Sequence, residues 1–323
     1  MMFPFQVPKE LIAQFPRKNG TDSRNLAVFR SSGKLQEGTF KENLKRFIQK
    51  GDILVFNNSK VVNARVPILN SRFQDLLIVG PFEGFQAKVL IKNLRKLKVG
   101  ESFEFSKDCW GQFLGRDGHF GVFRFYPSVR EVISQVGTPP IPMYVRKGKA
   151  NQEDFERYNN VYSSSEGSVA APTAGFHFDE EALSLLDKLG AKKKFLTLHI
   201  GVGAFMPQLG VSDEYYEISQ EICDLLTNKD GGRIVAVGTS TIRALETWAQ
   251  TGQPSGTTNL IIEQDYKFKV VEAFFTNFHM PNSSHLKIVI AFLGLELTQK
   301  AYFYALERKF LFFSYGDCMF CCD

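Results

Sequence analysis

The chain has 323 residues, of which 44% are hydrophobic and 23% are charged, and this balance excludes an intrinsically disordered protein. The length suffices for about two domains with cores of their own. The 39 Lys and Arg residues exceed the 34 Asp and Glu residues by five, a weak positive charge that permits a polyanionic partner without requiring one.

The N-terminal residues lack a basic region followed by an apolar run and a cleavage site, and no window holds 18 apolar residues. We therefore expect a cytoplasmic protein. Cys109 and Cys223 stand alone and three cysteines crowd the C-terminus, so we expect reduced thiols rather than a disulfide framework. A zinc site at 318–322 would need a fourth ligand that no second CxxC motif or nearby histidine offers, and we expect no metal.

The first third of the chain predicts a helix followed by a buried strand. Thr39 and Glu42 form a capping box, an apolar stripe follows, and Gly51 is expected to end the helix. The strand at 52–56 runs into the polar segment 57–60, and 61–66 is extended again. This pattern begins an α/β unit.

The segment from about residue 65 to 140 changes character. Short β-rich runs are separated by glycines and charged turns, which is typical of a small all-β unit, plausibly a barrel. A single helix is expected at 129–136, before a proline-rich linker. The expected strands are 76–79, 87–91, 103–105 and 119–126.

Helices and strands alternate again in the C-terminal half. We therefore predict an α/β fold: a discontinuous α/β domain, in two parts at 1–65 and 143–323, with an inserted small all-β barrel domain at 66–142. Asp179 caps one helix that Gly190 ends, and Ser219 caps another. The other expected elements are helices at 241–250, 286–292 and 298–308 and strands at 195–200, 233–237, near Leu260 and at 270–274.

The segment 168–178 has small residues, a proline and a glycine leading into His177. Such a run packs poorly as a helix or strand, but it allows backbone to approach a ligand closely. We expect Gly175 to adopt a positive φ and to aim Thr173 and His177 at one point. A tight structural turn with an incidental histidine is the alternative.

A second histidine, His199, lies at the end of the strand 195–200, where open α/β sheets place their ligands. A core histidine bonded to the backbone is the alternative. The glycines at 201 and 203 suggest a dinucleotide loop, but Met206 stands where the third glycine is required, which excludes that interpretation.

A strand leads through Gly238 and Thr239 into a helix that carries Arg243. Free N–H groups at a helix start suit an anion, and a guanidinium there is favourable when an anion also binds. An ion pair between Arg243 and Glu246 within the helix is the alternative.

A third histidine, His279, follows a strand together with Asn277. Three of the five histidines thus lie in polar loops at the ends of elements, which makes chance clustering the weaker explanation. His119 and His285 have no comparable context, and we interpret them as structural or surface residues. Asp317 adds a carboxylate in a turn near the C-terminus.

Taken together, these segments resemble one family, the S-adenosylmethionine:tRNA ribosyltransferase-isomerases of the queuosine pathway. They follow the order of the family from about residue 7 to 320, and the combination is far more specific than any one motif. The matching segments are Gly51-Asp52 with 55–61 and Ala64-Arg65, then 167–178, 198–203, 236–240 with Arg243 and Glu246, 276–281 and 313–317.

The resemblance implies a reaction and its partners. The ribosyl part of S-adenosylmethionine is transferred to 7-aminomethyl-7-deazaguanine in the tRNA anticodon stem-loop and is rearranged to give epoxyqueuosine, while adenine and methionine leave. S-adenosylmethionine is thus a co-substrate, and no true cofactor is expected. The resemblance also implies an α/β domain with an inserted β-barrel. We expect a monomer.

We assign hypothetical roles on this basis. One imidazole could remove a proton next to the sulfonium, and a second acid could protonate the departing adenine. The catalytic candidates are His177, His199 and His279, with no choice made among them. The substrate-binding candidates are Asn57, Thr173, Gly175, Gly238, Thr239, Arg243, Asn277 and Asp317, of which Gly238, Thr239 and Arg243 would bind an anion.

The chain departs from the family in its segment 206–213, which is shorter than usual and lacks two histidines. A non-catalytic RNA- or nucleoside-binding paralogue is therefore the alternative function, and a methyltransferase is a more distant one. A set of basic residues could follow an anticodon stem or form a solvated face. This set is Lys41, Lys45, Arg46, Lys92, Arg95, Lys96 and Lys98.

Overall fold

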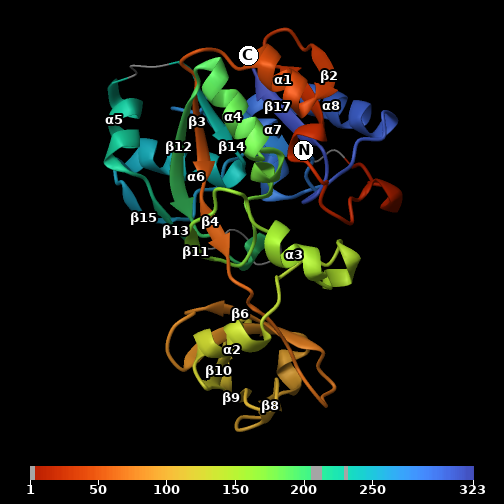
Figure 1. Cartoon of the computed structure of the whole chain (residues 1–323), viewed down its shortest axis with the longest axis vertical. Coiled ribbons are helices and arrows are strands. Elements are labelled where there is room, and N and C mark those ends of the chain that lie inside the picture. Colours follow the sequence, from red (N-terminus) through yellow and green to blue (C-terminus); the bar gives the residue numbers. More distant parts are fainter. Residues whose placement is uncertain (1–3, 205–212, 229–231) are drawn as a thin grey trace. The chain divides into compact units, whose positions relative to one another are not determined.

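The computed structural model describes residues 4–204, 213–228 and 232–323 (Figure 1). The chain divides into two compact units. Unit 1 comprises Met1–Lys60, Asn159–Ser165 and Ala171–Asp323, and unit 2 comprises Val61–Tyr158 and Glu166–Ala170. The structure is a mixed α/β fold with one large sheet in unit 1 and a curled antiparallel sheet in unit 2.

The sheet of unit 1 contains four neighbouring parallel strands, in the order β12-β3-β14-β16. Their carboxyl ends therefore meet at one edge of the sheet. Antiparallel strands extend the sheet beyond β12. Beyond β16, two antiparallel pairings and one parallel pairing extend it. In spatial order the strands are β15 (Ser255–Thr258), β13 (Glu214–Glu217), β12 (Lys192–Leu198), β3 (Ile53–Asn57), β14 (Ile234–Val237), β16 (Ala273–Asn277), β17 (Cys318–Cys322), β1 (Arg24–Phe29) and β2 (Leu35–Thr39).

Helices cover both faces of this sheet. Helices α1 (Phe40–Phe47) and α4 (Glu180–Leu189) pack on one face, and α6 (Thr239–Thr251) packs against β3, β12 and β14 on the other (Figure 1). Because both faces are covered, the parallel strands are apolar on both sides, as the buried β3 shows. The remaining helices of this unit are α5 (Gln220–Asn228), α7 (Ser284–Leu293) and α8 (Leu295–Glu307).

The capping box of α1 is confirmed: the Thr39 hydroxyl accepts from the Glu42 N–H, and the Glu42 carboxylate accepts from the Thr39 N–H. The predicted end of this helix is wrong. Helix α1 ends at Phe47, and Gly51 instead adopts a φ of 91° in the turn before β3. The cap of α4 by Asp179 and its end at Gly190, with a φ of 73°, agree with the prediction.

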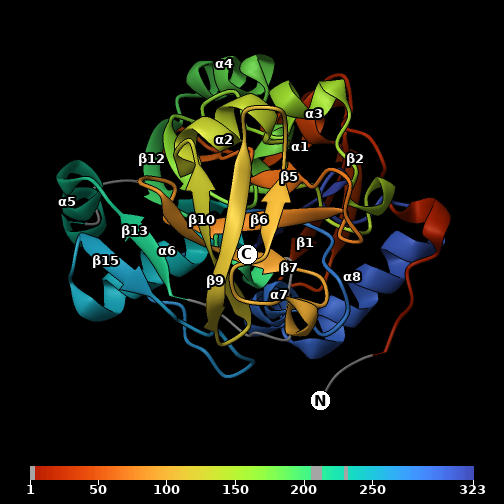
Figure 2. The ribbon, with the colours of Figure 1, turned by 90° about the horizontal axis from the view of Figure 1, so that it is seen from below.

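Unit 2 contains a six-stranded antiparallel sheet that curls into a half-barrel (Figure 2). The small all-β barrel that we expected is thus seen as a half-barrel: β5 and β8 end the sheet, and the Leu69 N–H bonds to the Glu104 carbonyl at 2.8 Å beside them. Strand β9 was not predicted. In spatial order the strands are β5 (Arg65–Pro67), β6 (Asp75–Gly80), β7 (Gln86–Ile91), β10 (Phe120–Tyr126), β9 (Trp110–Asp117) and β8 (Ser102–Glu104), with α2 at Val129–Val136.

Short elements complete the described chain. Strand β4 (Ser59–Val61) pairs with β11 (Ser165–Ser168), and α3 spans Gln152–Arg157. Among the described residues, no helix is long and apolar enough to span a membrane. The 3₁₀ helices are Lys9–Leu11, Gly20–Asp22, Leu94–Lys96, Arg146–Gly148, Thr173–His177 and Val202–Ala204.

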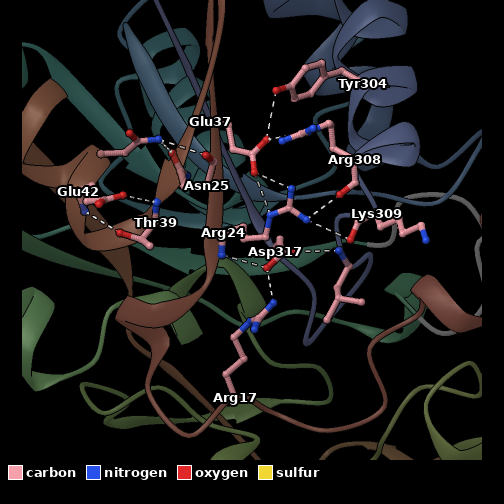
Figure 3. Close-up of polar contacts among 12 residues, drawn as sticks. Arg17, Arg24, Asn25, Glu37, Thr39, Glu42, Tyr304, Arg308, Lys309 and Asp317 are labelled. Carbon is pink, nitrogen blue, oxygen red and sulfur yellow. Dashed lines mark hydrogen bonds and ion pairs between the residues drawn. The ribbon is translucent and has the colours of Figure 1, made fainter.

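The cysteine-rich C-terminal segment forms β17, which the sequence analysis did not predict. This fully buried strand lies between β16 and β1. Asp317, directly before it, is fully buried and is held by three donors (Figure 3). Its carboxylate accepts from the Arg24 N–H at 3.0 Å, the Leu311 N–H at 2.7 Å and the Arg17 guanidinium at 2.5 Å. Asp317 thus anchors β17 to the N-terminal segment.

We predict that Asp317→Ala lowers the free energy of unfolding by about 3–5 kcal/mol, because it removes the buried carboxylate that accepts from the Arg17 guanidinium and from two backbone N–H groups. Asp323→Ala is the matched control, since Asp323 pairs with Arg30 at 2.7 Å on the surface. That pair should contribute less than about 1 kcal/mol. Urea unfolding of both variants measures the difference, and equal losses would contradict the anchoring role.

Candidate functional site

The predicted site residues follow the carboxyl ends of the four parallel strands. His199 comes directly after β12, and Asn57 is the last residue of β3. Gly238 follows β14, and Asn277 is the last residue of β16, two residues before His279. Their side chains and backbone are therefore gathered at one edge of the sheet of unit 1, the position at which open α/β sheets bind ligands.

His177 lies in a polar cluster with Thr173 and Asn277. Its Nδ1 is 2.8 Å from Ser23 Oγ, and its Nε2 is 3.3 Å from Asn277 Nδ2. The Thr173 hydroxyl donates to Asn277 Oδ1 at 3.2 Å. Burial lowers the pKa of His177 to about 3, and the positive charge of Arg17 acts in the same direction. A neutral imidazole with both nitrogens engaged therefore holds this loop against β16.

Gly175 does not adopt the positive φ that we expected. Its lack of a side chain instead allows two neighbouring side chains to approach its backbone closely. A Cβ at this position would lie 2.1 Å from the Tyr162 hydroxyl oxygen and 2.5 Å from Asn160 Oδ1. Gly175 is thus required by protein packing around Tyr162 and Asn160, two residues that the sequence analysis did not single out.

His199 is half-buried, whereas His177 is buried. Its Nδ1 is 2.8 Å from Ser59 Oγ, and its ring stacks on Tyr215 with centroids 6.0 Å apart. Within the described part of the chain, its Nε2 has no hydrogen-bond partner. Burial lowers the pKa of His199, and the charge of Glu217 opposes this shift. His199 therefore presents a neutral imidazole with one nitrogen available.

Asn57 positions the His199 loop. Its amide nitrogen donates to the Leu198 carbonyl at 2.9 Å and to Ser240 Oγ at 3.1 Å. Its amide oxygen accepts from the N–H groups of Leu198 and Ser59, each at 3.0 Å. These four hydrogen bonds occupy the buried side chain, so Asn57 connects β3, β12 and the start of α6.

His279 forms a stacked pair with His285, at a centroid distance of 5.3 Å. The His279 Nε2 is 2.6 Å from Thr276 Oγ1. Burial and then His285 lower the pKa of His279, while burial and then the charge of Arg243 lower the pKa of His285 to about 4. The sequence analysis assigned His285 no specific role, because the effect of Arg243 on it depends on tertiary structure.

Arg243 is held by Glu214, a residue of β13. The guanidinium forms an ion pair with the Glu214 carboxylate and donates to the carbonyls of Leu260 at 3.1 Å and Thr258 at 3.3 Å. The other Glu214 oxygen accepts from the Gly201 N–H at 2.8 Å. Glu214 therefore connects α6 to the loop that follows His199.

The alternative pairing of Arg243 with Glu246 is wrong. Glu246 is fully buried and accepts from the Tyr266 hydroxyl at 2.9 Å and from the backbone N–H groups of 269–271. It therefore organises the segment before β16.

The start of α6 lies against the loop of His177. Gly238 has a φ of 91°, and a Cβ at this position would lie 3.4 Å from that of Ala174. No side chain caps the helix, and the first N–H groups, beginning at Thr239, have no partner within it. Gly238 and Thr239 therefore remain suited to an anion, whereas Arg243 and Asp317 are engaged with protein groups.

Two further expectations concern metals and the shortened loop. In the described ranges, no three His, Cys, Asp or Glu residues lie close enough together to hold a metal ion. All five cysteines are free thiols and buried. Of the shortened segment 206–213, residues 206–212 lie outside the described part of the chain.

The sequence as a whole matches known proteins. The model of the family described as "Queuosine biosynthesis protein" matches residues 1–321. The chain belongs to this queuosine biosynthesis family. This membership confirms the resemblance found in the motifs.

Relatives within the queuosine biosynthesis family match over nearly their whole length. Proteins named S-adenosylmethionine:tRNA ribosyltransferase-isomerase are 36% identical in Thermoanaerobacter sp., covering 98% of both chains, and 38% identical in Polynucleobacter necessarius, covering 99% of this chain and 97% of the relative. The crystal structure of S-adenosylmethionine tRNA ribosyltransferase from Thermotoga maritima is 29% identical, with a TM-score of 0.58 and 98% coverage of each chain.

We predict that His177 makes the fold sensitive to acid. The unfolded chain binds a proton at His177 near pH 6.5, but the folded chain binds it only near pH 3, so stability falls as the pH drops through this window. The slope from this residue is at most about 1.4 kcal/mol per pH unit. Urea unfolding between pH 7 and 4.5 should show a shallower slope for His177→Asn than for the wild type. An unchanged slope would contradict the buried neutral state.

We predict that Arg243→Met raises the pKa of His285 from its value of about 4, because it removes a nearby positive charge. The increase should be up to about one unit, since burial remains the larger cause. Histidine NMR titration measures it. Arg233→Met is the control, because Arg233 pairs with Asp52 at 2.7 Å before β14 and should leave the His285 pKa unchanged. Equal titrations in all three proteins would exclude the coupling.

Proposed function

We propose that this protein transfers the ribosyl group of S-adenosylmethionine to 7-aminomethyl-7-deazaguanine in the tRNA anticodon and isomerises it, giving epoxyqueuosine, adenine and methionine. The observation that carries the proposal is the gathering of three histidine loops at one sheet edge in a chain of the queuosine biosynthesis family. The names of the full-length relatives support the same reaction. No observation favours a non-catalytic paralogue.

His199 is the general base of this proposal. Protons on the ribosyl carbon next to the sulfonium are acidified, and a neutral imidazole can remove one. His199 is half-buried, with Nε2 available and a lowered pKa, so it is neutral at pH 7. A hydrogen bond from Nδ1–H to Ser59 Oγ would leave the Nε2 lone pair free to accept the proton.

The departing adenine needs a proton, and burial keeps His177, His279 and His285 neutral at pH 7. Once His199 has taken up a proton, it is the one protonated histidine at this edge. Its lowered pKa means that it gives this proton up readily. In this scheme the proton removed from carbon passes through His199 to adenine. The neutral imidazole regenerated on His199 then accepts the proton that the amine loses when its nitrogen bonds to the ribosyl carbon. Methionine then leaves as a neutral thioether without a further acid.

The methionine carboxylate is placed at the start of α6, where Gly238 and Thr239 precede N–H groups without helical partners. The partly positive helix end stabilises an anion there by about 0.3–1 kcal/mol. His177, Thr173 and Asn277 hold the neighbouring loop in place. These residues therefore position the substrate pocket rather than carry the proton.

The proposal extends to the domain organisation, the cellular location, the oligomeric state and the cofactor requirement. The two parts at 1–65 and 143–323 act as one catalytic α/β domain, and the segment 66–142 is an inserted domain. The protein works as a cytoplasmic monomer, with S-adenosylmethionine as co-substrate and no further cofactor. The tRNA substrate is a polyanion, which suits the mild positive charge of +5.

Incubation with S-adenosylmethionine and tRNA that carries 7-aminomethyl-7-deazaguanine tests the function. Mass spectrometry should find epoxyqueuosine in the digested RNA and free adenine in solution. Binding of both substrates without either product would contradict the proposal and favour the paralogue. A methylated base would identify a methyltransferase instead.

We predict that His199→Ala lowers kcat by roughly 10²- to 10⁴-fold, the usual contribution of a general base. His119→Ala, a change to an exposed histidine of unit 2, is the control and should keep the full rate. Because the base must be unprotonated, the wild-type rate should fall with decreasing pH below 6.5. A full rate in His199→Ala would exclude this role.

A further inference from the structure

Unit 2 exposes a stacked pair of large aromatic side chains that has no role in the site described above. The rings of Trp110 and Tyr126 stack with centroids 5.6 Å apart and planes at 28°. Trp110 is 41% exposed and Tyr126 is 55% exposed. Exposed pairs of this size are uncommon on a sheet surface that has a filled core on its other side.

The register of the half-barrel sheet places this pair on its outer face. Tyr126 of β10 lies directly opposite Trp110 of β9, and Arg124 lies opposite Gln112. Side chains alternate along each strand, so Phe113 and Phe125 point into the buried core instead. We call the outward set of Trp110, Gln112, Arg124 and Tyr126 the aromatic face.

The surroundings of the aromatic face are polar. Arg124 is exposed and forms no ion pair with any described residue. Gln86, opposite Arg124 on β7, is exposed as well. The aromatic face is therefore two stacked rings bordered by polar groups, not the broad apolar patch that a protein partner usually covers.

The charge of unit 2 fits a polyanion. It contains 15 Lys and Arg residues against 11 Asp and Glu residues, so it carries +4 of the net +5 of the chain in about a third of the residues. Glu104 of β8 lies opposite Trp110 and is exposed. This carboxylate repels a phosphate at Trp110, so an uncharged base is favoured on the rings and phosphate toward Arg124.

We propose that the aromatic face binds unpaired bases of the tRNA substrate, with a base stacked on the Trp110–Tyr126 pair and the adjoining phosphate at Arg124. Base stacking on aromatic side chains tolerates any sequence, since every base has a π-face. This inference rests on the proposed function for the identity of the RNA. It adds a second contact region for that RNA, in unit 2, to the histidine-lined edge in unit 1.

Tryptophan fluorescence offers a direct test, because the chain contains only two tryptophans. Trp248→Phe removes the one on α6 and leaves Trp110 as the sole reporter. Titration of this variant with tRNA, without S-adenosylmethionine, should quench the fluorescence as a base stacks on the indole. A poly-uridine oligonucleotide should do the same more weakly, and double-stranded RNA should not.

Affinity measurements show whether Trp110 binds tRNA by stacking, and folding controls show whether a variant is simply unfolded. Trp110→Ala should weaken tRNA binding by roughly 5- to 100-fold, the usual effect of losing one stacked base. Trp110→Phe should restore most of the affinity. Phe155→Ala removes a ring that is also 41% exposed in unit 2 but lies on α3, and it should bind tRNA like the wild type. Circular dichroism and thermal unfolding confirm that each variant is folded.

The kinetic readout distinguishes failure of this inference from failure of the proposed function. Trp110→Ala should raise KM for tRNA and leave kcat and KM for S-adenosylmethionine unchanged. If no epoxyqueuosine forms with any variant but tRNA quenches Trp110, the function fails and the aromatic face stands as an RNA-binding surface. Unchanged tRNA affinity in Trp110→Ala would overturn the inference, as would a dimer that this substitution dissociates.

Discussion

The parallel pairing of β12, β3, β14 and β16 is the constraint on which the proposed site depends. It brings four loops to one edge of the sheet, and Asn57 then joins three of the elements there through four hydrogen bonds. The first residues of the loops after β3 and β12 are held by the pairing of these strands and by the buried Asn57 amide. A preorganised site of this kind avoids reorganisation during the reaction.

Burial keeps the histidines at this edge of the sheet neutral. Each of its histidines has a pKa below the ordinary value of 6.5, with desolvation as the largest cause. His177 uses both ring nitrogens and His279 uses Nε2 to contact neighbouring side chains, whereas His199 uses Nδ1 and keeps Nε2 available. In the proposed function, histidines therefore both hold the site together and accept the proton.

Local signals predicted much of the fold, and contacts between distant segments account for most of what was missed. The capping box of α1 depends on residues three positions apart and was predicted from the sequence. Strand β17 was not predicted, because the strands it pairs with, β1 and β16, lie far away in the sequence. Likewise, each site histidine could be placed at a strand end, but the pairing of Arg243 with Glu214 depends on tertiary structure.

The central claim is that S-adenosylmethionine binds at the carboxyl edge of the parallel strands, and a crystal structure of the complex with S-adenosylmethionine tests it most directly. The account predicts the methionine carboxylate at the start of α6 and the ribosyl carbon next to the sulfonium within about 3.5 Å of His199 Nε2. A ligand bound away from the loops of His177, His199 and His279 would contradict it.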